Sequence, residues 1–346
     1  MDDTQRTLIE KAERAHRLSE EELASLLADD AAEEAMAAAA DRVRRAFVGD
    51  EVHLRGLIEF SSYCRQNCMY CGLRRDNEKA QRYRLTPEEI VALAEKAKAA
   101  GYPTVVMQSG EDAWFTAERL AAIVREVKAL GLTVTLSVGE RTREEYRALR
   151  EAGADRFLLR IETTDQALYE RLDPGMSYEN RVRCLADLKS LGYEVGTGCL
   201  VGLPGQSVAS LARDVLFFQS IDADMVGIGP LVPNGDTPLG DVPAGDMRLV
   251  RRVAAAIRLL LPEANIPATT AMETLLPGAR ELMLRSGANV MMPNVTEGEA
   301  RQKYALYPGK ACVADTPAHC RACMEGRIQA MGRTVGQGAG GRRRAL

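Results

Sequence analysis

Short apolar runs alternate with longer amphipathic stretches between about residue 53 and residue 294. The apolar runs are rich in β-branched residues and have the length of strands buried on both faces. The eight runs that we interpret as strands are 53–60, 104–110, 133–139, 156–163, 194–203, 225–233, 266–272 and 289–294. The stretches between them have the 3.6-residue periodicity of amphipathic helices. They lie near 86–101, 116–130, 142–152, 178–191, 207–220, 246–261 and 277–286.

The first of these helical stretches carries clear boundary signals. Thr86 and Glu89 form a capping box, Pro87 suits the first helical position, and Gly101 is a typical helix stop. Eight strands that alternate with helices predict an α/β fold, a (β/α)8 barrel of the TIM type. A doubly wound dinucleotide-binding sheet would carry a G-x-G-x-x-G turn after its first strand, and the sequence has none there. The barrel predicts that the loops after the strands build the active site.

The first residues of the chain differ from the barrel in composition. Residues 1–48 are charged and rich in alanine, which favours helix, and Ser19 with Glu22 forms another capping box. We therefore predict an N-terminal helical segment at 1–48, followed by the barrel at 49–300.

The C-terminal segment, 301–346, lacks a clear periodicity. Pro308, Gly309 and Pro317 predict loop rather than regular structure. From Gly332 onward the chain is rich in glycine and arginine. This composition predicts a flexible terminus, with an anion-binding arm as the alternative.

The overall composition excludes several classes of function. Hydrophobic residues make up 46% and charged residues 27% of the chain, as in soluble globular proteins. No run approaches about 18 consecutive apolar residues and no basic-then-apolar leader is present, so we expect neither a membrane span nor a secretory signal. The net charge of −4 and the aromatic content of 5% argue against nucleic-acid binding. Eight cysteines without a signal indicate a reducing compartment, and we expect a cytoplasmic protein.

A cysteine motif, C-x3-C-x2-C, follows the first predicted strand directly. Cys64, Cys68 and Cys71 offer three thiolates, which can hold three irons of a [4Fe–4S] cluster and leave the fourth iron open to a chelating molecule. A zinc site would require a fourth nearby cysteine or histidine, and His53 is poorly placed on the strand. Buried unreactive thiols are the other alternative. The spacing and position favour the iron–sulfur cluster.

The fourth predicted strand carries charge on one face. Arg156, Leu158, Arg160 and Glu162 share that face by the two-residue period of a strand, and the opposite face is apolar. Charged side chains inside a barrel are costly unless they meet ligands or each other. The apolar face suits contact with a covering helix, so we predict that the charged face points into the barrel. The alternative is that the charged face points outward beneath a helix.

Two levels of resemblance follow from these motifs. The cysteine motif, with Tyr70 before its last cysteine, resembles that of the radical S-adenosylmethionine (SAM) superfamily. Strings between about residues 47 and 325 are similar to the HydE family of [FeFe]-hydrogenase maturases, among them IEFSSYCRQNCMYCGLRR, QSGED, LLRIET, VGLPGQ, IPATTAM and YPGKAC. The resemblance implies a radical SAM enzyme of H-cluster maturation with a complete barrel around a large cavity. It would cleave SAM reductively to a 5′-deoxyadenosyl radical, which acts at sulfur on a cysteine-ligated Fe(CO)2CN precursor during diiron subcluster assembly.

The resemblance also assigns roles to particular residues. The catalytic [4Fe–4S] cluster would be held by Cys64, Cys68 and Cys71, and SAM would be surrounded by Tyr70, Ser109, Gly110, Glu111, Glu162 and Arg181. The substrate cavity would be lined by Thr135, Arg156, Arg160, Thr269, Thr270, Met292 and Tyr307. Since neighbours in a regular strand point opposite ways, one of the two adjacent threonines would then be structural. An accessory [2Fe–2S] or [4Fe–4S] cluster would be held by Cys312, Cys320 and Cys323, with free thiols as the alternative.

The implied partners are a small organometallic or amino-acid-like substrate, the other hydrogenase maturases, and a reductant protein such as a flavodoxin or ferredoxin. Two other functions compete with this interpretation. One is a radical SAM mutase similar to methylornithine synthase. The other is an iron–sulfur carrier or electron-transfer protein without radical chemistry, which would need neither the cavity nor the residues that face SAM.

Overall fold

A six-stranded parallel sheet forms most of the barrel wall in the computed structural model, which describes residues 1–312 and 316–342. Its strands, in spatial order, are β2 (Gly56–Ser61), β3 (Thr104–Ser109), β4 (Thr133–Ser137), β5 (Arg156–Leu158), β6 (Glu194–Thr197) and β8 (Met225–Val226). Single parallel bridges close the ring: Met225 to Asn265, Pro267 to Val290, and Leu57 to Asn294. Val290 belongs to β10 (Val290–Met291), so the eighth unit keeps a strand while the seventh is reduced to bridges. The predicted (β/α)8 arrangement is confirmed.

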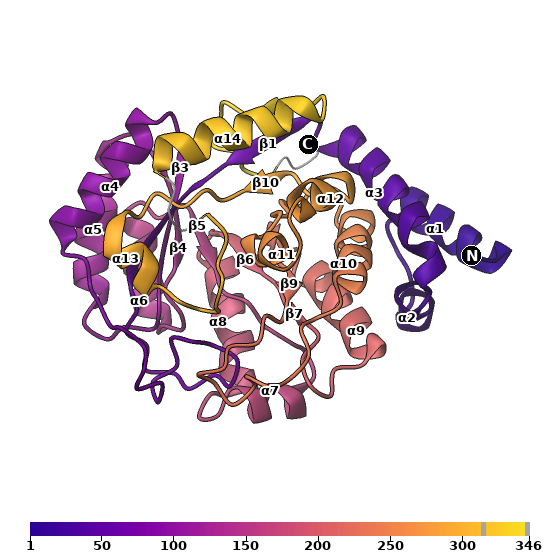
Figure 1. Ribbon diagram of the computed structural model, residues 1–346, viewed down its shortest axis with the longest axis horizontal. Coiled ribbons are helices and arrows are strands. Elements are labelled where there is room, and N and C mark those ends of the chain that lie inside the picture. Colours follow the sequence, from indigo (N-terminus) through magenta and orange to yellow (C-terminus); the bar gives the residue numbers. More distant parts are fainter. Residues whose placement is uncertain (313–315, 343–346) are drawn as a thin grey trace.

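Most helices of the barrel surround this ring, as Figure 1 shows, whereas the short α11 (Thr270–Leu275) is drawn inside the ring of outer helices. The other barrel helices are α4 (Pro87–Ala99), α5 (Ala117–Ala129), α6 (Arg143–Glu151), α7 (Gln166–Leu172), α8 (Tyr178–Ser190), α9 (Val208–Ser220), α10 (Met247–Leu260) and α12 (Ala279–Arg285). The predicted capping box of α4 is confirmed, because Thr86 accepts the Glu89 N–H and Glu89 accepts the Thr86 N–H. Capping satisfies backbone donors that the helix itself leaves unpaired, and so fixes where α4 begins.

The N-terminal helices pack on the outside of the barrel, against α9 and α10. They are α1 (Asp3–Ala15), α2 (Glu20–Ala28), the 3-10 turn η1 (Asp30–Ala32) and α3 (Glu33–Phe47). The capping box of Ser19 and Glu22 is present at the start of α2. Buried Glu33 accepts from Arg248 and Arg251 of α10, which ties α3 to the barrel.

The first predicted strand is divided in two. Residues 53–60 contribute to β1 (Glu51–Leu54) and to β2, with Arg55 buried between them. β1 pairs with β10 on one side and with β11 (Thr334–Val335) on the other, away from the six-stranded sheet. A further short pair joins β7 (Leu200–Val201) to β9 (Gly229–Pro230). The apolar pattern could not show this division, because both strands are buried and the break falls on one residue.

The C-terminal segment contains more regular structure than predicted. It includes α13 (Gly298–Lys303) and the 14-residue α14 (Pro317–Ala330), which Figure 1 shows crossing one edge of the barrel. The interpretation of Pro317 as a loop residue is wrong: it occupies the first turn of α14, where a missing N–H costs nothing. Thr316 caps the helix, and Cys320, Met324 and Ile328 form its buried face.

The glycine-rich tail packs against the barrel as far as residue 342. The carbonyl of Ala339 accepts from Thr104 and from Arg156, and the carbonyl of Gly340 accepts from Arg55. A Cβ at Gly340 would lie 2.5 Å from the His53 ring, so only glycine fits there. The prediction of a flexible terminus is therefore wrong for residues 334–342, which hold fixed contacts. Residues 343–346 lie outside the described residues.

The seventh predicted strand, 266–272, becomes a bridge followed by a helix. Thr269 is the N-cap of α11 and Thr270 is its first residue. The strand-based argument that only one of these threonines faces the cavity is therefore wrong, because the chain has already turned into a helix. No helix among the described residues is both long and apolar enough to cross a membrane.

Candidate active site

A cavity of ≈ 370 Å³ lies inside the barrel, lined by residues from the strands and from the loops that follow them. Most of the predicted site residues line it: Cys64, Cys68, Cys71, Ser109, Gly110, Glu111, Thr135, Arg160, Glu162, Arg181, Thr269, Thr270, Met292 and Tyr307. Tyr70 and Arg156 are outside this lining. The structure thus brings together residues that are more than 200 positions apart in the chain.

The three cysteines of the first motif occupy one wall of the cavity. Backbone N–H groups point at their sulfurs: Glu111 N–H lies 3.3 Å from the Sγ of Cys64, and the amide of Leu73 faces Cys71. Burial raises the pKa of Cys64, and it raises the pKa of Cys71 to about 12. Amide donors around cysteine sulfurs stabilise the negative charge of a bound iron–sulfur cluster. The loop therefore fits a cluster held by three thiolates.

Tyr70 packs away from the cavity, toward α7. Its hydroxyl donates to Asp173 Oδ1 at 2.9 Å, and its ring contacts a small apolar group that includes Leu168 and Leu172. Burial raises the pKa of Asp173. Tyr70 therefore anchors the cysteine loop to α7 in this structure, and Asp173 is a contact that the sequence analysis missed.

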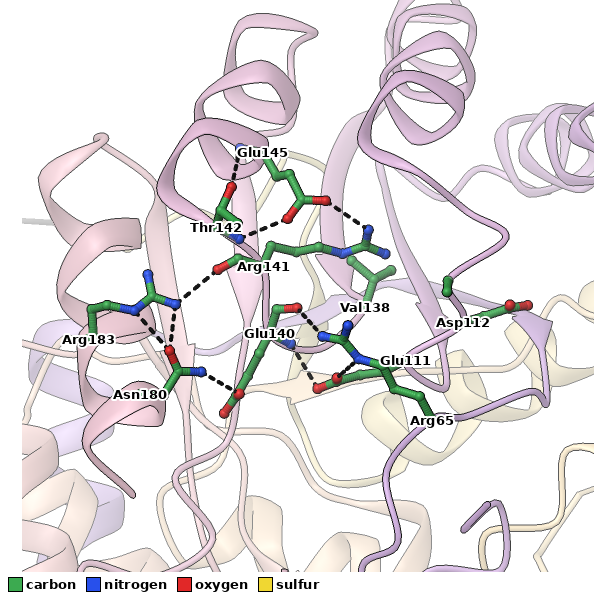
Figure 2. A pocket seen from close by; sticks show the side chains of 11 residues that line it. Arg65, Glu111, Asp112, Val138, Glu140, Arg141, Thr142, Glu145, Asn180 and Arg183 are labelled. Atoms are coloured by element: carbon green, nitrogen blue, oxygen red, sulfur yellow. Dashed lines mark hydrogen bonds and ion pairs between the residues drawn. The ribbon is translucent and has the colours of Figure 1, made fainter. Parts of the chain in front are cut away.

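Glu111 is part of a hydrogen-bonded polar wall (Figure 2). Its carboxylate accepts from Arg65 Nε at 3.0 Å, from Gln66 Nε2 at 2.6 Å and from the Glu140 N–H at 2.9 Å. Gly139 makes this possible: its φ is +77°, and a Cβ there would lie 1.9 Å from Glu111. On the outer side of the wall lies a second pocket of ≈ 260 Å³, shown in Figure 2. Glu111 therefore separates the cavity from an outer polar pocket.

Arg181 is held in place by Glu140, a residue that the sequence analysis missed. Arg181 Nε donates to Glu140 Oε1 at 2.7 Å, and its Nη1 donates to the carbonyl of Arg160. Both side chains are buried, and Asn180 donates to the other Glu140 oxygen at 2.6 Å. Glu140 directly follows the predicted strand 133–139, so its place at a strand's C-terminal end was the available signal.

Glu162 has an unusual backbone conformation beside the cavity. Its φ is +64°, which costs energy in a residue other than glycine and is typical of functional sites. Its Oε2 lies 3.2 Å from Arg160 Nη2 but makes no hydrogen bond, and burial raises the pKa of the carboxyl. The prediction that Arg160 and Glu162 point into the barrel is confirmed. An acceptor without a donor inside a cavity fits the hydroxyl groups of a bound molecule.

Several hydrogen-bonding atoms of the cavity lining are buried without a hydrogen-bond partner in the described structure. They are Arg55 Nε, Thr135 Oγ1, Thr269 Oγ1, Arg160 Nε and, facing each other as an ion pair, Arg160 Nη2 and Glu162 Oε2. As the N-cap of α11, Thr269 would ordinarily accept from its own helix, yet its hydroxyl makes no such bond. Thr270 differs, because its Oγ1 accepts from Arg280 at 3.0 Å. Buried polar groups are normally satisfied, so these atoms mark a place for a polar ligand.

A segment from the C-terminal region closes part of the cavity. Lys310 pairs with buried Glu59 of β2, and its Nζ lies 5.3 Å from the centre of the Tyr304 ring. The Tyr304 hydroxyl accepts from Gln108 at 3.2 Å. Glu59, Tyr304 and Lys310 all line the cavity, and the sequence analysis assigned none of them. The motif YPGKAC, which contains Tyr307 and Lys310, was the available signal.

Arg156 lies at the opposite end of the barrel from the cysteines' loop. It donates to Glu194 Oε2 at 2.7 Å and to the tail carbonyl of Ala339 at 3.0 Å. The prediction that Arg156 lines the cavity is therefore wrong, although its side chain is buried. The reason is its register: Arg156 begins β5, at the end remote from the loops that follow the strands. Arg55, which the sequence analysis did not assign, lines the cavity from near this end.

The second cysteine group is divided between a loop and a helix. Cys312, at φ +63°, lies 3.9 Å from Arg280 Nη1, and buried Cys320 on α14 lies 3.8 Å from Arg301 Nη2. Both cysteines line one small pocket, whereas Cys323 is exposed. The two cysteines outside the triplets, Cys184 and Cys199, are fully buried.

Comparison with known proteins places this site in a family. The model of the radical SAM superfamily matches residues 58–218. The chain is 51% identical over 345 residues to the [FeFe] hydrogenase maturase subunit HydE of Thermotoga maritima, covering 99% of each protein. It is 32% identical to 3-methylornithine synthase of Methanosarcina acetivorans over 82% of this chain and 81% of that one.

Solved structures show the same fold. The crystal structure of methylornithine synthase (PylB) has a TM-score of 0.83 at 29% identity, covering 95% of this chain and 97% of that chain. The crystal structure of HydG, a maturase of the [FeFe]-hydrogenase, has a TM-score of 0.82 at 20% identity, covering 95% of this chain and 75% of that chain. The alignment to HydE extends over nearly the whole chain and therefore spans the cysteine loop. The chain therefore belongs to the radical SAM superfamily and, within it, to the HydE family of [FeFe]-hydrogenase maturases.

Proposed function

We propose that this enzyme binds its [4Fe–4S] cluster through Cys64, Cys68 and Cys71 and acts on a cysteine-ligated Fe(CO)2CN unit during diiron subcluster assembly. The observation that carries the proposal is the set of unpartnered groups on Thr135, Thr269 and the Arg160 Nε. A hydroxyl or guanidinium donor suits the carboxylate and cyanide groups of such a substrate. The identity to the HydE subunit supports this choice of substrate class.

When bound, the cluster and SAM supply a 5′-deoxyadenosyl radical that acts at the substrate sulfur. The chain's contribution is to hold and enclose the reacting groups. Glu162 and Arg181 would contact SAM, with Arg181 oriented by Glu140. Ser109 and Gly110 would contact SAM through the turn after β3, where Glu111 belongs to the hydrogen-bonded wall.

Exclusion of water is the second contribution of the chain. A carbon radical reacts with whatever lies beside it, so an enclosed cavity protects the reaction. Buried Tyr304 and the ion pair of Lys310 with Glu59 line the cavity on the C-terminal side. On the opposite side, tail residues hold Arg55 and Arg156. Tyr307 and Met292 complete the substrate wall.

Other components are part of the same proposal. The enzyme would work with the other hydrogenase maturases and with a flavodoxin or ferredoxin as reductant. Cys312, Cys320 and Cys323 would hold an accessory cluster after the loop of Cys312 and α14 adjust, since they do not line one pocket together here.

The test is in vitro maturation of apo-hydrogenase with purified components. The wild-type protein should support maturation, and Thr269→Val should lower it at least tenfold, because an apolar group then replaces the donor. Thr7→Val serves as the control, because Thr7 is exposed on α1, away from the cavity lining, and its hydroxyl donates to the Asp3 carbonyl within the helix. Dithionite-driven SAM cleavage should be nearly unchanged in both variants.

The same assay separates the competing mutase. Similarity to methylornithine synthase in sequence and fold makes lysine the substrate to try beside the iron compound. Conversion of lysine to methylornithine without maturation would overturn the proposed substrate while leaving the radical SAM assignment intact.

A further inference from the structure

Two exposed aromatic rings, each covered by an arginine, lie beside the cysteine loop. The Cζ of Arg84 lies 3.7 Å from the centre of the Tyr63 ring, and the Cζ of Arg119 lies 4.2 Å from that of the Trp114 ring. Tyr63 and Trp114 are 37% and 38% exposed, unusual values for large aromatic side chains. These four residues are called the arginine–aromatic patch below. None of them lines the cavity or contacts the predicted SAM residues through its side chain in the described structure.

Buried Asp112 joins the two halves of the patch. Arg84 donates to both of its oxygens, at 2.6 and 3.0 Å, and the Trp114 N–H donates to Oδ1 at 3.0 Å. Arg119 Nη1 donates to the Trp114 carbonyl at 2.6 Å. The patch is therefore one preorganised surface, and little side-chain freedom is lost when a partner binds it.

The patch is connected directly to the first cysteine. Tyr63 precedes Cys64 in the chain, and its carbonyl lies so close to Gly110 that a Cβ there would be 2.3 Å away. The next residue, Glu111, donates its N–H to Cys64 Sγ at 3.3 Å. A protein bound at the patch would therefore lie above the loop that fits the cluster.

The charge of this region differs from that of the whole chain. Residues 62–84 carry six basic and two acidic side chains, although the full chain has a net charge of −4. Arg65, Arg75 and Lys79 are 59%, 61% and 75% exposed, and each also pairs with one carboxylate, of Glu111, Asp76 and Asp236 respectively. Positive potential around a binding surface accelerates the approach of an acidic partner. Exposed aromatic and arginine side chains are enriched in protein interfaces.

We propose that the arginine–aromatic patch is the docking surface for the acidic one-electron carrier protein that reduces this enzyme. The inference rests on the proposed function, because reductive SAM cleavage consumes one electron at the cysteine loop. In the transfer, a carrier such as flavodoxin hydroquinone loses one electron and becomes the semiquinone, and the oxidised cluster gains it. Such redox complexes are small and short-lived, which matches a compact patch rather than an extended groove.

The test uses the cluster-loaded enzyme with SAM and without substrate. Reduction by flavodoxin hydroquinone is followed by stopped-flow absorbance, and binding of oxidised flavodoxin is measured by titration. We expect Arg119→Glu to lower the second-order rate by about tenfold at low salt, with the difference shrinking at high salt because the interaction is electrostatic. Trp114→Ala should weaken binding at both salt concentrations, because it removes apolar contact.

Two controls make the outcome decisive. Arg6→Glu changes an exposed arginine in the first turns of a helix, as Arg119→Glu does, but α1 lies on the far side of the molecule from α5 (Figure 1). Flavodoxin should reduce the Arg6→Glu enzyme at the wild-type rate. Dithionite, a small reductant that needs no docking surface, should reduce all the variants equally.

The proposal would be overturned if flavodoxin reduced both patch variants at the wild-type rate. It would also be overturned if dithionite reduced these variants more slowly by the same factor, because the substitutions would then act on the cluster itself. These outcomes are separate from the fate of the proposed substrate. An enzyme that fails to mature hydrogenase still reports on the patch, because the readout is electron transfer and carrier binding.

Discussion

The two cysteine triplets of this chain have similar compositions but different structural settings. Cys64, Cys68 and Cys71 belong to one loop after β2, and all three line the same cavity. The second triplet is split: Cys312 lies in a loop, whereas α14 carries Cys320 and Cys323. Of these two helical residues, one is buried and the other exposed.

This difference shows what decides whether neighbouring cysteines converge on one point. A loop can direct three neighbouring side chains toward one point, and amide N–H groups of the same loop can face the sulfurs. A helix fixes the direction of each side chain, so residues three apart lie close on its surface but need not share the same burial. A cysteine motif therefore predicts ligands, but the element that carries it decides whether they converge.

The largest expected effect is on the first triplet. Replacing Cys64, Cys68 or Cys71 singly with alanine should abolish reductive SAM cleavage, by at least about 100-fold, because two thiolates cannot hold a site-differentiated cluster. The measurement is dithionite-dependent formation of 5′-deoxyadenosine, with circular dichroism to check the fold. Cys323→Ala is the matched control and should retain activity. Activity in any first-triplet variant would contradict the cluster assignment.

The second triplet should be dispensable for SAM cleavage. Replacing Cys312, Cys320 and Cys323 together should lower bound iron by about two to four atoms per chain, as expected for one lost cluster. SAM cleavage and most of the maturation activity should remain, because these residues lie outside the cavity lining. Iron analysis and both activity assays check this. A well-folded triple variant without SAM cleavage would show that the two triplets act together.

Thiol reactivity in the cluster-free protein should follow the same contrast. Iodoacetamide reacts with thiolates, and burial raises the pKa of Cys71 to about 12, so Cys71 stays protonated at pH 8. Exposed Cys323 should therefore be alkylated at least tenfold faster, as measured by peptide mass spectrometry. The rate at Cys71 should rise with pH up to about 12, because the thiolate fraction grows until the pKa is passed. Equal labelling at pH 8 would mean that the first loop opens without its cluster.

The smallest expected effect concerns backbone strain. Cys312 has φ +63°, a conformation that glycine adopts without penalty. In the cluster-free protein, Cys312→Gly should therefore leave the free energy of unfolding unchanged or raise it by up to about 1 kcal/mol. Relief of backbone strain stabilises the folded state, whereas the greater freedom of a glycine in the unfolded chain offsets part of that gain. Cys323→Ser, at an exposed position, should change stability by less than about 0.5 kcal/mol. Chemical denaturation measures both, and a loss of more than about 2 kcal/mol for the glycine variant would show that the Cys312 side chain supports the fold.

Local sequence signals predicted the features that depend on neighbouring residues. The capping boxes at Ser19 and Thr86 form as expected, because each needs only a few residues around a helix start. The alternation of strands and helices predicted the barrel, since each unit buries its apolar face against the next one. The inward direction of Arg160 and Glu162 was predicted correctly, but the strand period is not its cause, because β5 ends at Leu158 and both residues lie in the segment that follows it.

Other features depend on contacts that no local pattern contains. Glu140 matters because it meets Arg181, 41 residues later in the chain. Arg156 was assigned to the cavity from its face on the strand, but its height along the barrel places it beside the tail carbonyl of Ala339. Two residues on one face of a strand lie at different depths along the barrel axis. The two-residue period shows which face a side chain is on, but not its depth.

By itself, the sequence determined the cysteine loop, the order of strands and helices, and the presence of charged side chains inside the barrel. These follow from residue type, spacing and period, which act over short stretches of chain. Only the tertiary structure decided that the tail packs beneath Arg55, that Lys310 reaches Glu59 from the far end of the chain, and that the second triplet is split. Such contacts join segments that lie far apart in the chain, so they arise only when the whole barrel has closed and the depth of each side chain is set.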